Sequence, residues 1–379
     1  MRITKFIPVL LVLTLSLFSP LSAAGEAALN HHFKLEFDHA GITSLKCTYD
    51  GLGTEHIAAG KTLGHIKARY RMGSGEWQDF GTQKMRDEWT VKQGAEDGAP
   101  QRLVVYNGSG WYDYYADLEL TERFRLEDDV LFWTMHLRNL THKPIDIADL
   151  ILPLPFNQEN RGPGDRTTPG RLILRQFIWD HGAYLYLKRE DGQGPCLLMT
   201  PVEKCPYFEP AQTERNFKPS KLEYADAEGV YIFSAGQASG LPQAGIPAFP
   251  THTSLKLTPK FTPGDEITYG FKFRWAEDEQ KINDILYEEG LFVVEVKPGG
   301  SLASDTEAVV SLRTKKSIGS VLASFPGQTK INPLGKADDD GILYGVKFSR
   351  PGENFLRFEF SDSRRLILRF SVIKPAEPR

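Results

Sequence analysis

The segment WDHGAYLY, residues 179–186, brings an aspartate and a histidine next to a glycine between two apolar stretches. An imidazole and a carboxylate can exchange protons with a bound ligand when their pKa values are well separated. His181 is therefore a candidate catalytic residue, with Asp180, or Glu209 in CPYFEP, as its carboxylate partner. The alternative is that Asp180 and His181 shape a turn and hydrogen-bond to the main chain. Both interpretations stay open at this point.

A second segment, GSGWYDYYADL, places four aromatic side chains within positions 111–115. Aromatic rings stack on the apolar faces of pyranose rings, and the polar ends of Trp and Tyr bind hydroxyl groups. The candidate substrate-binding residues of the chain are Trp111, Tyr112, Tyr114, Trp179 and Tyr184. Packing at a domain interface is the alternative, since Trp and Tyr are also typical of such interfaces.

The three cysteines, Cys47, Cys196 and Cys205, do not have the spacing of a zinc site. Cys196 and Cys205 flank LLMTPVEK, which is compatible with a disulfide across a hairpin that turns near Thr200 and Pro201. Cys47 would then be unpaired, and buried free thiols are the alternative. The nine histidines show no metal-binding spacing, and G-x-S-x-G is absent. We therefore expect no metal, no cofactor and no α/β-hydrolase.

The N-terminus, MRITKFIPVLLVLTLSLFSPLSAAGEA, has the three parts of a secretory signal peptide. Arg2 and Lys5 precede an apolar stretch, and Ser22–Ala24 supplies a small-residue cleavage site. We assign residues 1–24 to this signal and expect a periplasmic or extracellular protein with no membrane attachment after cleavage. The net charge of -4 over 379 residues gives no electrostatic footprint for nucleic acid.

Residues 30–275 consist mainly of short segments with strand character, separated by Gly, Pro, Asn and Asp. In ADLELTERFRLE apolar and polar residues alternate with Glu122 as the single exception, and WTMHLRN alternates in the same way. This alternation predicts strands with one buried face. IADLILPLPF is apolar almost throughout and predicts a strand in the interior of a two-layered assembly. The number of strands favours one large antiparallel sandwich.

Residues 276–290 have the pattern of one helix, which begins with acidic residues as a helix N-terminus favours. Its apolar stripe consists of Ile282, Ile285 and Leu286, and Gly290 marks its C-terminal end. We expect this helix to connect the large sandwich to a small β-sandwich of immunoglobulin-like size at residues 291–373, with five strands. Residues 374–379 form a tail.

The segment LELTERFRLEDDVLFWTMHLRNLTHKPIDIADLILPLPF resembles the core of galactose-mutarotase-like sandwich domains. The matching positions are Asp129, Leu131, Asn139, Thr141, Lys143 and Pro144. Three further segments, GKTLGHIKARYRMGSGEW, HGAYLYLKREDGQGPCLLMTPV and FKFRWAEDEQKINDILYEEGLFVVEVKPG, look like those of large secreted bacterial proteins of unassigned function. In those proteins a mutarotase-like sandwich and a small β domain precede a helical toroid related to glycoside hydrolases and polysaccharide lyases. The resemblance covers about residues 30–375, so we expect the chain to correspond to the front part of such a protein, either as a truncated gene product or as a free-standing relative.

The resemblance implies a mainly β fold, in which a large antiparallel galactose-mutarotase-like supersandwich is followed by a connector helix and a small immunoglobulin-like β-sandwich. It also implies roles for the candidate catalytic residues. Mutarotase-like enzymes use a histidine to protonate the sugar ring oxygen and a carboxylate to deprotonate the anomeric hydroxyl. These would be the roles of His181 and of Glu209 or Asp180.

We accordingly expect a secreted, carbohydrate-associated protein that forms the non-catalytic sandwich portion of a glycan-degrading system. Its expected partners are a poly- or oligosaccharide and a helical toroid domain or partner chain. One alternative is a self-contained sugar-active epimerase, lyase or hydrolase that uses a His/carboxylate pair. Another is a protein-interaction scaffold with no glycan specificity.

Overall fold

A computed structural model of the chain describes residues 26–38, 40–76, 78–82, 90–96, 99–106, 118–157, 172–177, 184–202, 209–211, 229–234, 260–261, 266–337, 341–362 and 364–374. Within these residues the fold consists of five β-sheets, one α-helix and one 3-10 turn, η4 (Pro326–Gln328). The predicted mainly β class, with antiparallel sheets, is confirmed. The segment of the predicted signal peptide lies outside the described residues.

The largest layer is an eight-stranded antiparallel sheet, called the large sheet below. Its strands are β6 (Thr90–Glu96), β7 (Ala99–Tyr106), β8 (Leu118–Glu127), β9 (Val130–Asn139), β11 (Leu172–Phe177), β12 (Tyr184–Arg189), β13 (Cys196–Pro201) and β17 (Glu266–Ala276). They are arranged in the order β11-β12-β13-β17-β9-β8-β7-β6. Strands that are far apart in sequence, such as β17 and β9, are therefore adjacent in the sheet.

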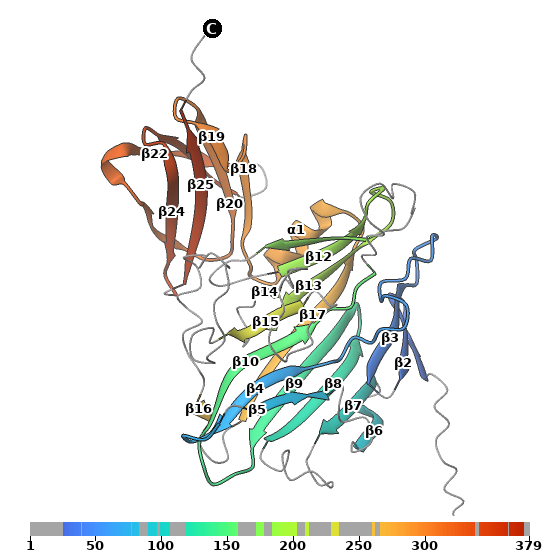
Figure 1. Cartoon of the computed structure of the whole chain (residues 1–379). Helices are drawn as coiled ribbons and strands as arrows, with labels where there is room; N and C mark the ends of the chain where they lie inside the picture. Colours follow the sequence, from blue (N-terminus) through green and yellow to red (C-terminus); the bar gives the residue numbers. More distant parts are fainter. Residues whose placement is uncertain are drawn as a thin grey trace, which may run out of the picture.

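The facing layer is a six-stranded sheet, called the second sheet below. Its strands are β4 (Lys67–Met72), β5 (Gln78–Gly81), β10 (Ile145–Pro153), β14 (Glu209–Ala211), β15 (Gly229–Ser234) and β16 (Lys260–Phe261). A three-stranded sheet of β1 (Glu26–Leu29), β2 (Phe33–Asp38) and β3 (Gly41–Cys47) lies at the side of the sandwich (Figure 1).

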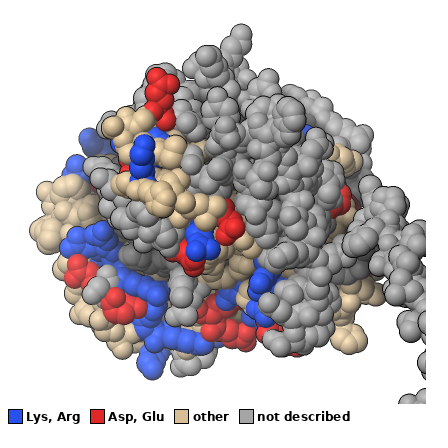
Figure 2. All heavy atoms as spheres, turned by 90° about the horizontal axis from the view of Figure 1, so that it is seen from below, with Lys and Arg blue, Asp and Glu red and all other residues tan. Residues whose placement is uncertain are grey.

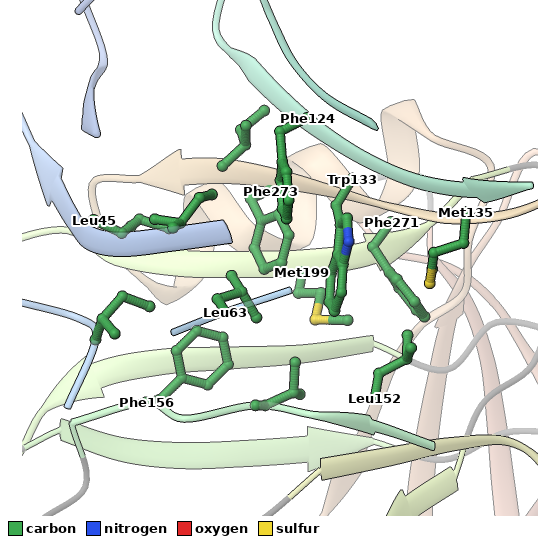
Figure 3. Packing of buried hydrophobic residues seen from close by; sticks show 14 of the residues in the cluster. Leu45, Leu63, Phe124, Trp133, Met135, Leu152, Phe156, Met199, Phe271 and Phe273 are labelled. Carbon is green, nitrogen blue, oxygen red and sulfur yellow. The ribbon is translucent and has the colours of Figure 1, made fainter. Parts of the chain in front are cut away.

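The core of the large sandwich lies between the large and second sheets. Buried residues occupy every second position of β9, as the alternation of the sequence predicts for a strand with one buried face. In Figure 3, Trp133 and Phe271 point from the large sheet toward Leu152 of β10, on the facing layer. β10 lies in the interior of the second sheet, between β15 and β4, which agrees with its apolar sequence.

Glu122, the exception to the alternation of β8, has its side chain in this core and is fully buried. Trp133 Nε1 donates a 2.6 Å hydrogen bond to Glu122 Oε1. Gly64 passes close by, because a Cβ at this position would lie 3.3 Å from Glu122 Oε1 and 2.6 Å from the carbonyl oxygen of Ala40. The side chain of Glu122 therefore belongs to the core, which explains why the alternation of β8 is interrupted at this position.

The helix α1 (Glu279–Glu288) begins and ends close to where the sequence predicts. Asp278 caps its N-terminus by accepting a hydrogen bond from the Lys281 amide, and Gly290, with φ +72°, follows its C-terminus. Its stripe of Ile282, Ile285 and Leu286 is buried against the large sheet. In Figure 1, α1 lies between the large sandwich and the smaller body at the upper left.

The smaller body is a sandwich of two four-stranded sheets with its own core. Its strands are β18 (Val293–Lys297), β19 (Ser301–Ala303), β20 (Glu307–Arg313), β21 (Ile318–Ala323), β22 (Thr329–Lys336), β23 (Ile342–Phe348), β24 (Gly352–Phe360) and β25 (Arg365–Ile373). The sequence predicts only five of these eight, and misses β19, β21 and β22. All three lie at sheet edges, where one missing neighbour relaxes the alternation that signals a strand.

Candidate functional site

Of the predicted catalytic residues, only Glu209 lies in a described strand. Trp179, Asp180 and His181 lie outside the described residues, in the connection from β11 to β12 of the large sheet. Glu209 is the first residue of β14, where its main chain pairs with Tyr231 in the second sheet. The acid–base assignment of His181, Asp180 and Glu209 stays a prediction.

Of the predicted sugar-binding aromatic residues, only Tyr184 lies in the part of the chain that the structure describes. Trp111, Tyr112 and Tyr114 lie outside the described residues, between β7 and β8. Tyr184 is only 8% exposed and packs beneath α1 beside Tyr186. Burial raises the pKa of its phenol above the usual range. Tyr184 thus packs against α1, and its assignment as a sugar-binding residue stays a prediction.

The cysteines agree with the alternative of buried free thiols and not with the disulfide. Cys47 and Cys196 are buried free thiols, and Cys205 lies outside the described residues. The chain does not turn at Thr200 and Pro201, because β13 continues through Pro201, paired with β17 along its whole length and with β12 at Leu197–Met199. The structure has a thiol at Cys196 in place of the predicted disulfide with Cys205. Burial raises the pKa of this thiol to about 11.

The outer face of β8, β9 and β17 carries an exposed group of polar residues. The buried positions of β9 alternate with outward ones, so the polar residues between them point away from the core. Cross-strand pairing aligns them in two adjacent rows, Thr121, His136 and Thr268 in one row and Glu119, Arg138 and Glu266 in the next. The two rows lie near one end of the three strands.

His136 is at the centre of these rows. A hydrogen bond of 3.0 Å joins its Nδ1 to Thr268 Oγ1, and its Nε2 lies 3.4 Å from Glu266 Oε2. The second carboxylate oxygen, Oε1, lies 3.3 Å from Arg138 Nε. Thr268, His136, Glu266 and Arg138 thus form one chain of polar contacts, which we call the His136 cluster. The side chains of His136, Arg138 and Glu266 are 34%, 48% and 49% exposed, so a ligand can reach them.

Several hydrogen-bonding groups of the two rows remain open. Glu119 and Thr121, on β8, form no hydrogen bond or ion pair with any described residue, although both are only partly buried. Within the described part of the chain, only the Nε of Arg138 has a partner. The permanent charges of these rows, two carboxylates and one guanidinium, sum to a formal charge of -1 (from -1, -1 and +1). The two rows can therefore both donate and accept hydrogen bonds, and their carboxylates outnumber their guanidinium groups.

The other end of the same face forms the seat of α1. Thr200 Oγ1 donates a 2.7 Å hydrogen bond to Glu289 Oε2, and Lys272 Nζ lies 2.9 Å from the same oxygen. Arg274 Nη1 lies 3.9 Å from Glu289 Oε1. Glu289 caps the C-terminus of α1, where a negative charge opposes the helix dipole, so these cations compensate it. We attribute a structural role to this end of the face.

The opposite side of α1 is tied to the small sandwich. Asp284 Oδ1 lies 2.9 Å from Arg313 Nη1, and the Arg313 guanidinium stacks over the Tyr287 ring at 4.3 Å. Lys315 Nζ donates a 2.7 Å hydrogen bond to the Glu288 carbonyl oxygen. Since polar contacts hold α1 on both sides, the helix joins the two sandwiches into one platform.

A buried histidine lies elsewhere in the large sandwich. His56 is almost fully buried, with its ring 4.8 Å from that of Trp275. Burial lowers the pKa of His56 to about 4. Neither His56 Nε2 nor Trp275 Nε1 has a hydrogen-bond partner in the described structure. His56 is therefore a packing residue that is kept neutral.

The described residues contain no group of three or more His, Cys, Asp and Glu side chains arranged to hold a metal ion. No helix among them has the length and apolar character of a membrane span. On the face of the molecule in Figure 2, acidic and basic side chains are intermixed. This distribution agrees with the small net charge of the chain.

The protein thus belongs to the class of mainly β proteins in which a helix connects two β-sandwiches, and it carries a polar cluster on one exposed sheet face. The chain belongs to the family of unknown function DUF5695, which residues 47–378 match. No curated protein matches the sequence.

A solved polysaccharide lyase has a similar fold. The two chains are 13% identical, with a TM-score of 0.57 over 93% of this chain and 46% of the lyase. The chain thus spans less than half the length of the lyase, and at this identity the similarity shows a shared fold alone. The part that is shared is larger than either sandwich by itself.

Two smaller proteins are similar to part of the chain. A galactose mutarotase related enzyme from Lactobacillus acidophilus is 9% identical, with a TM-score of 0.40 over 67% of this chain and 98% of its own. An aldose epimerase homologue from C. elegans is 10% identical, with a TM-score of 0.41 over 67% of this chain and 100% of its own. Both similarities cover about two thirds of the chain, less than the similarity to the lyase does.

Proposed function

We propose that this protein is exported, associates with carbohydrate and forms the non-catalytic sandwich portion of a glycan-degrading system. The observation that carries the proposal is the extent of the fold similar to that of the polysaccharide lyase, which covers 93% of the chain. More than half of that lyase lies outside the similar part. A further domain or a partner chain would accordingly supply the catalytic groups.

The connection between the two sandwiches supports this role. α1 packs its apolar stripe on the large sheet and is bound to the small sandwich through Asp284 and Arg313. A platform of this kind can hold a glycan, or a neighbouring catalytic body, in a constant orientation. The N-terminal segment with the pattern of a signal peptide supports export. Export would bring the protein to polysaccharides outside the cytoplasm.

The proposal is tested with the purified mature chain in native gels that contain soluble neutral or acidic polysaccharides. We expect at least one polysaccharide to retard the protein and the chain alone to release no new reducing ends from it. Release of products would overturn the non-catalytic role and favour a self-contained sugar-active enzyme. Export is tested by expressing the full chain in a bacterium and sequencing the N-terminus of the periplasmic product, for which we expect cleavage after Ala24.

A further inference from the structure

We propose that the outer face of β8, β9 and β17 binds a sugar without acidic substituents, through the His136 cluster together with Glu119 and Thr121. This inference rests on the proposed function and gives it a site and a class of ligand.

This face carries hydrogen-bonding groups without a partner among the described residues, and their geometry suits the hydroxyl groups of a sugar. Carboxylate and guanidinium groups are planar and can each engage two polar atoms at once, so they suit neighbouring hydroxyl groups on a sugar ring. Glu119 offers an open carboxylate, Thr121 an open hydroxyl and Arg138 its terminal amino groups. Adjacent strands are about 4.8 Å apart, so these groups lie within the span of one or two sugar rings.

The described contacts in these rows lie on one side only, between β9 and β17. His136 and Arg138, on β9, bond only to the β17 residues Thr268 and Glu266, and their β8 neighbours have no described partner. Each exposed pair of this kind is worth only about 0.2–1 kcal/mol, so these contacts add little to the stability of the sheet. The imidazole and guanidinium are thus held in position from one side while the other side stays open.

The other end of the same strands shows the contrast. Arg125 is paired with Glu127 at 2.7 Å and lies over the Phe132 ring at 5.0 Å. Arg274 is paired with Asp129 at 2.7 Å. Charged groups at that end have partners within the chain, which makes Arg125 a suitable control position.

The sign of the charge on the two rows favours a neutral ligand. With Glu119 and Glu266 facing the ligand and Arg138 as the only permanent cation of the two rows, the carboxylate of a uronate would meet net repulsion. A neutral sugar has no such cost. The site is therefore expected to prefer neutral oligosaccharides to uronate oligosaccharides.

The test is isothermal titration of the mature protein with cellohexaose, xylohexaose, mannohexaose and hexagalacturonate. We expect one or more neutral probes to bind and hexagalacturonate to bind at least tenfold more weakly. Glu119→Gln, His136→Gln and Thr268→Val should each weaken the neutral probe by about five- to tenfold, which is the loss of one hydrogen bond. Arg125→Gln is the matched control and should bind as the wild type does.

A second readout separates the charge argument from folding defects. The double variant Glu119→Gln/Glu266→Gln should gain affinity for hexagalacturonate, a result that misfolding does not give. Equal binding by wild type and all cluster variants would overturn this site but leave the proposed function standing. Stronger binding of hexagalacturonate than of every neutral probe would overturn the ligand class. Failure of all four probes to bind the wild type would count against the proposed function itself.

Discussion

Trp133 of β9 donates a 2.6 Å hydrogen bond from its indole Nε1 to the fully buried carboxylate of Glu122 on the neighbouring strand β8. The same indole is stacked on Phe124 with ring centres 5.7 Å apart and an angle of 11° between the rings. A buried carboxylate that loses a donor keeps its desolvation cost, so this bond stabilises the fold more than an exposed one would.

We therefore expect Trp133→Phe to lower the free energy of unfolding by about 1–2 kcal/mol more than Trp275→Phe does. Both substitutions remove a buried indole, but Trp275 Nε1 has no hydrogen-bond partner in the described structure. Urea unfolding of both variants measures the difference. Equal destabilisation by the two substitutions would contradict the importance of the Glu122 bond.

His56 should make stability depend on pH. Burial lowers its pKa in the folded state to about 4, against about 6.5 in the unfolded chain, so protonation favours unfolding. Its contribution is complete above pH 6.5 and is lost as the pH falls toward 4, by up to about 3 kcal/mol. The nearby carboxylates Glu55 and Asp50 reduce this effect, and Trp275 packs against the ring without a charge.

The measurement for His56 is the loss of unfolding free energy between pH 7 and pH 4.5, in the wild type and in His56→Gln. We expect the loss to be clearly smaller in the variant, which cannot titrate at this position. If both proteins lose the same stability, other groups account for the acid sensitivity.

The seat of α1 provides a matched pair of glutamates. Glu289→Ala leaves Lys272 without its partner in a largely buried setting, and should cost about 1–3 kcal/mol of unfolding free energy. Glu295→Ala removes the partner of Lys297 in a pair whose side chains are 61% and 71% exposed, and should change stability by less than about 0.5 kcal/mol. Thermal or urea unfolding compares the stability of the two variants. A larger loss of stability in Glu295→Ala would contradict the structural role of Glu289.

Cys196 should be a slow nucleophile in the folded protein. Burial under α1 raises its pKa to about 11, so the reactive thiolate is scarce at pH 8. We expect alkylation of Cys196 only after unfolding, and without prior reduction, as peptide mapping by mass spectrometry will show. Recovery of a peptide in which Cys196 is linked to Cys205 would contradict the free thiol.

The layered fold could be predicted from the sequence because alternation is a local signal. Positions 118–126 and 133–137 show which side chains of β8 and β9 face the core, and the acidic start and apolar stripe of α1 mark its bounds. The exception at Glu122 is also visible, but its partner Trp133 is found only when the register of the two strands is known.

The His136 cluster could not be predicted for the same reason. His136 and Arg138 are recognisable as outward residues of their strand, yet Thr268 and Glu266 lie about 130 residues further along the chain and reach them only through the pairing of β17 with β9. Tyr184 is a candidate sugar-binding residue in the sequence because it lies in the segment WDHGAYLY. Whether a helix covers an outward face depends on packing, which the local pattern does not contain.

The most direct test of the account is a glycan array of neutral and uronate oligosaccharides, probed with the labelled mature chain and with His136→Gln. The account predicts binding to neutral glycans by the mature chain and a clear loss of this binding in the variant. Absence of binding to every glycan, with the protein shown to be folded by circular dichroism, would contradict a carbohydrate-associated function.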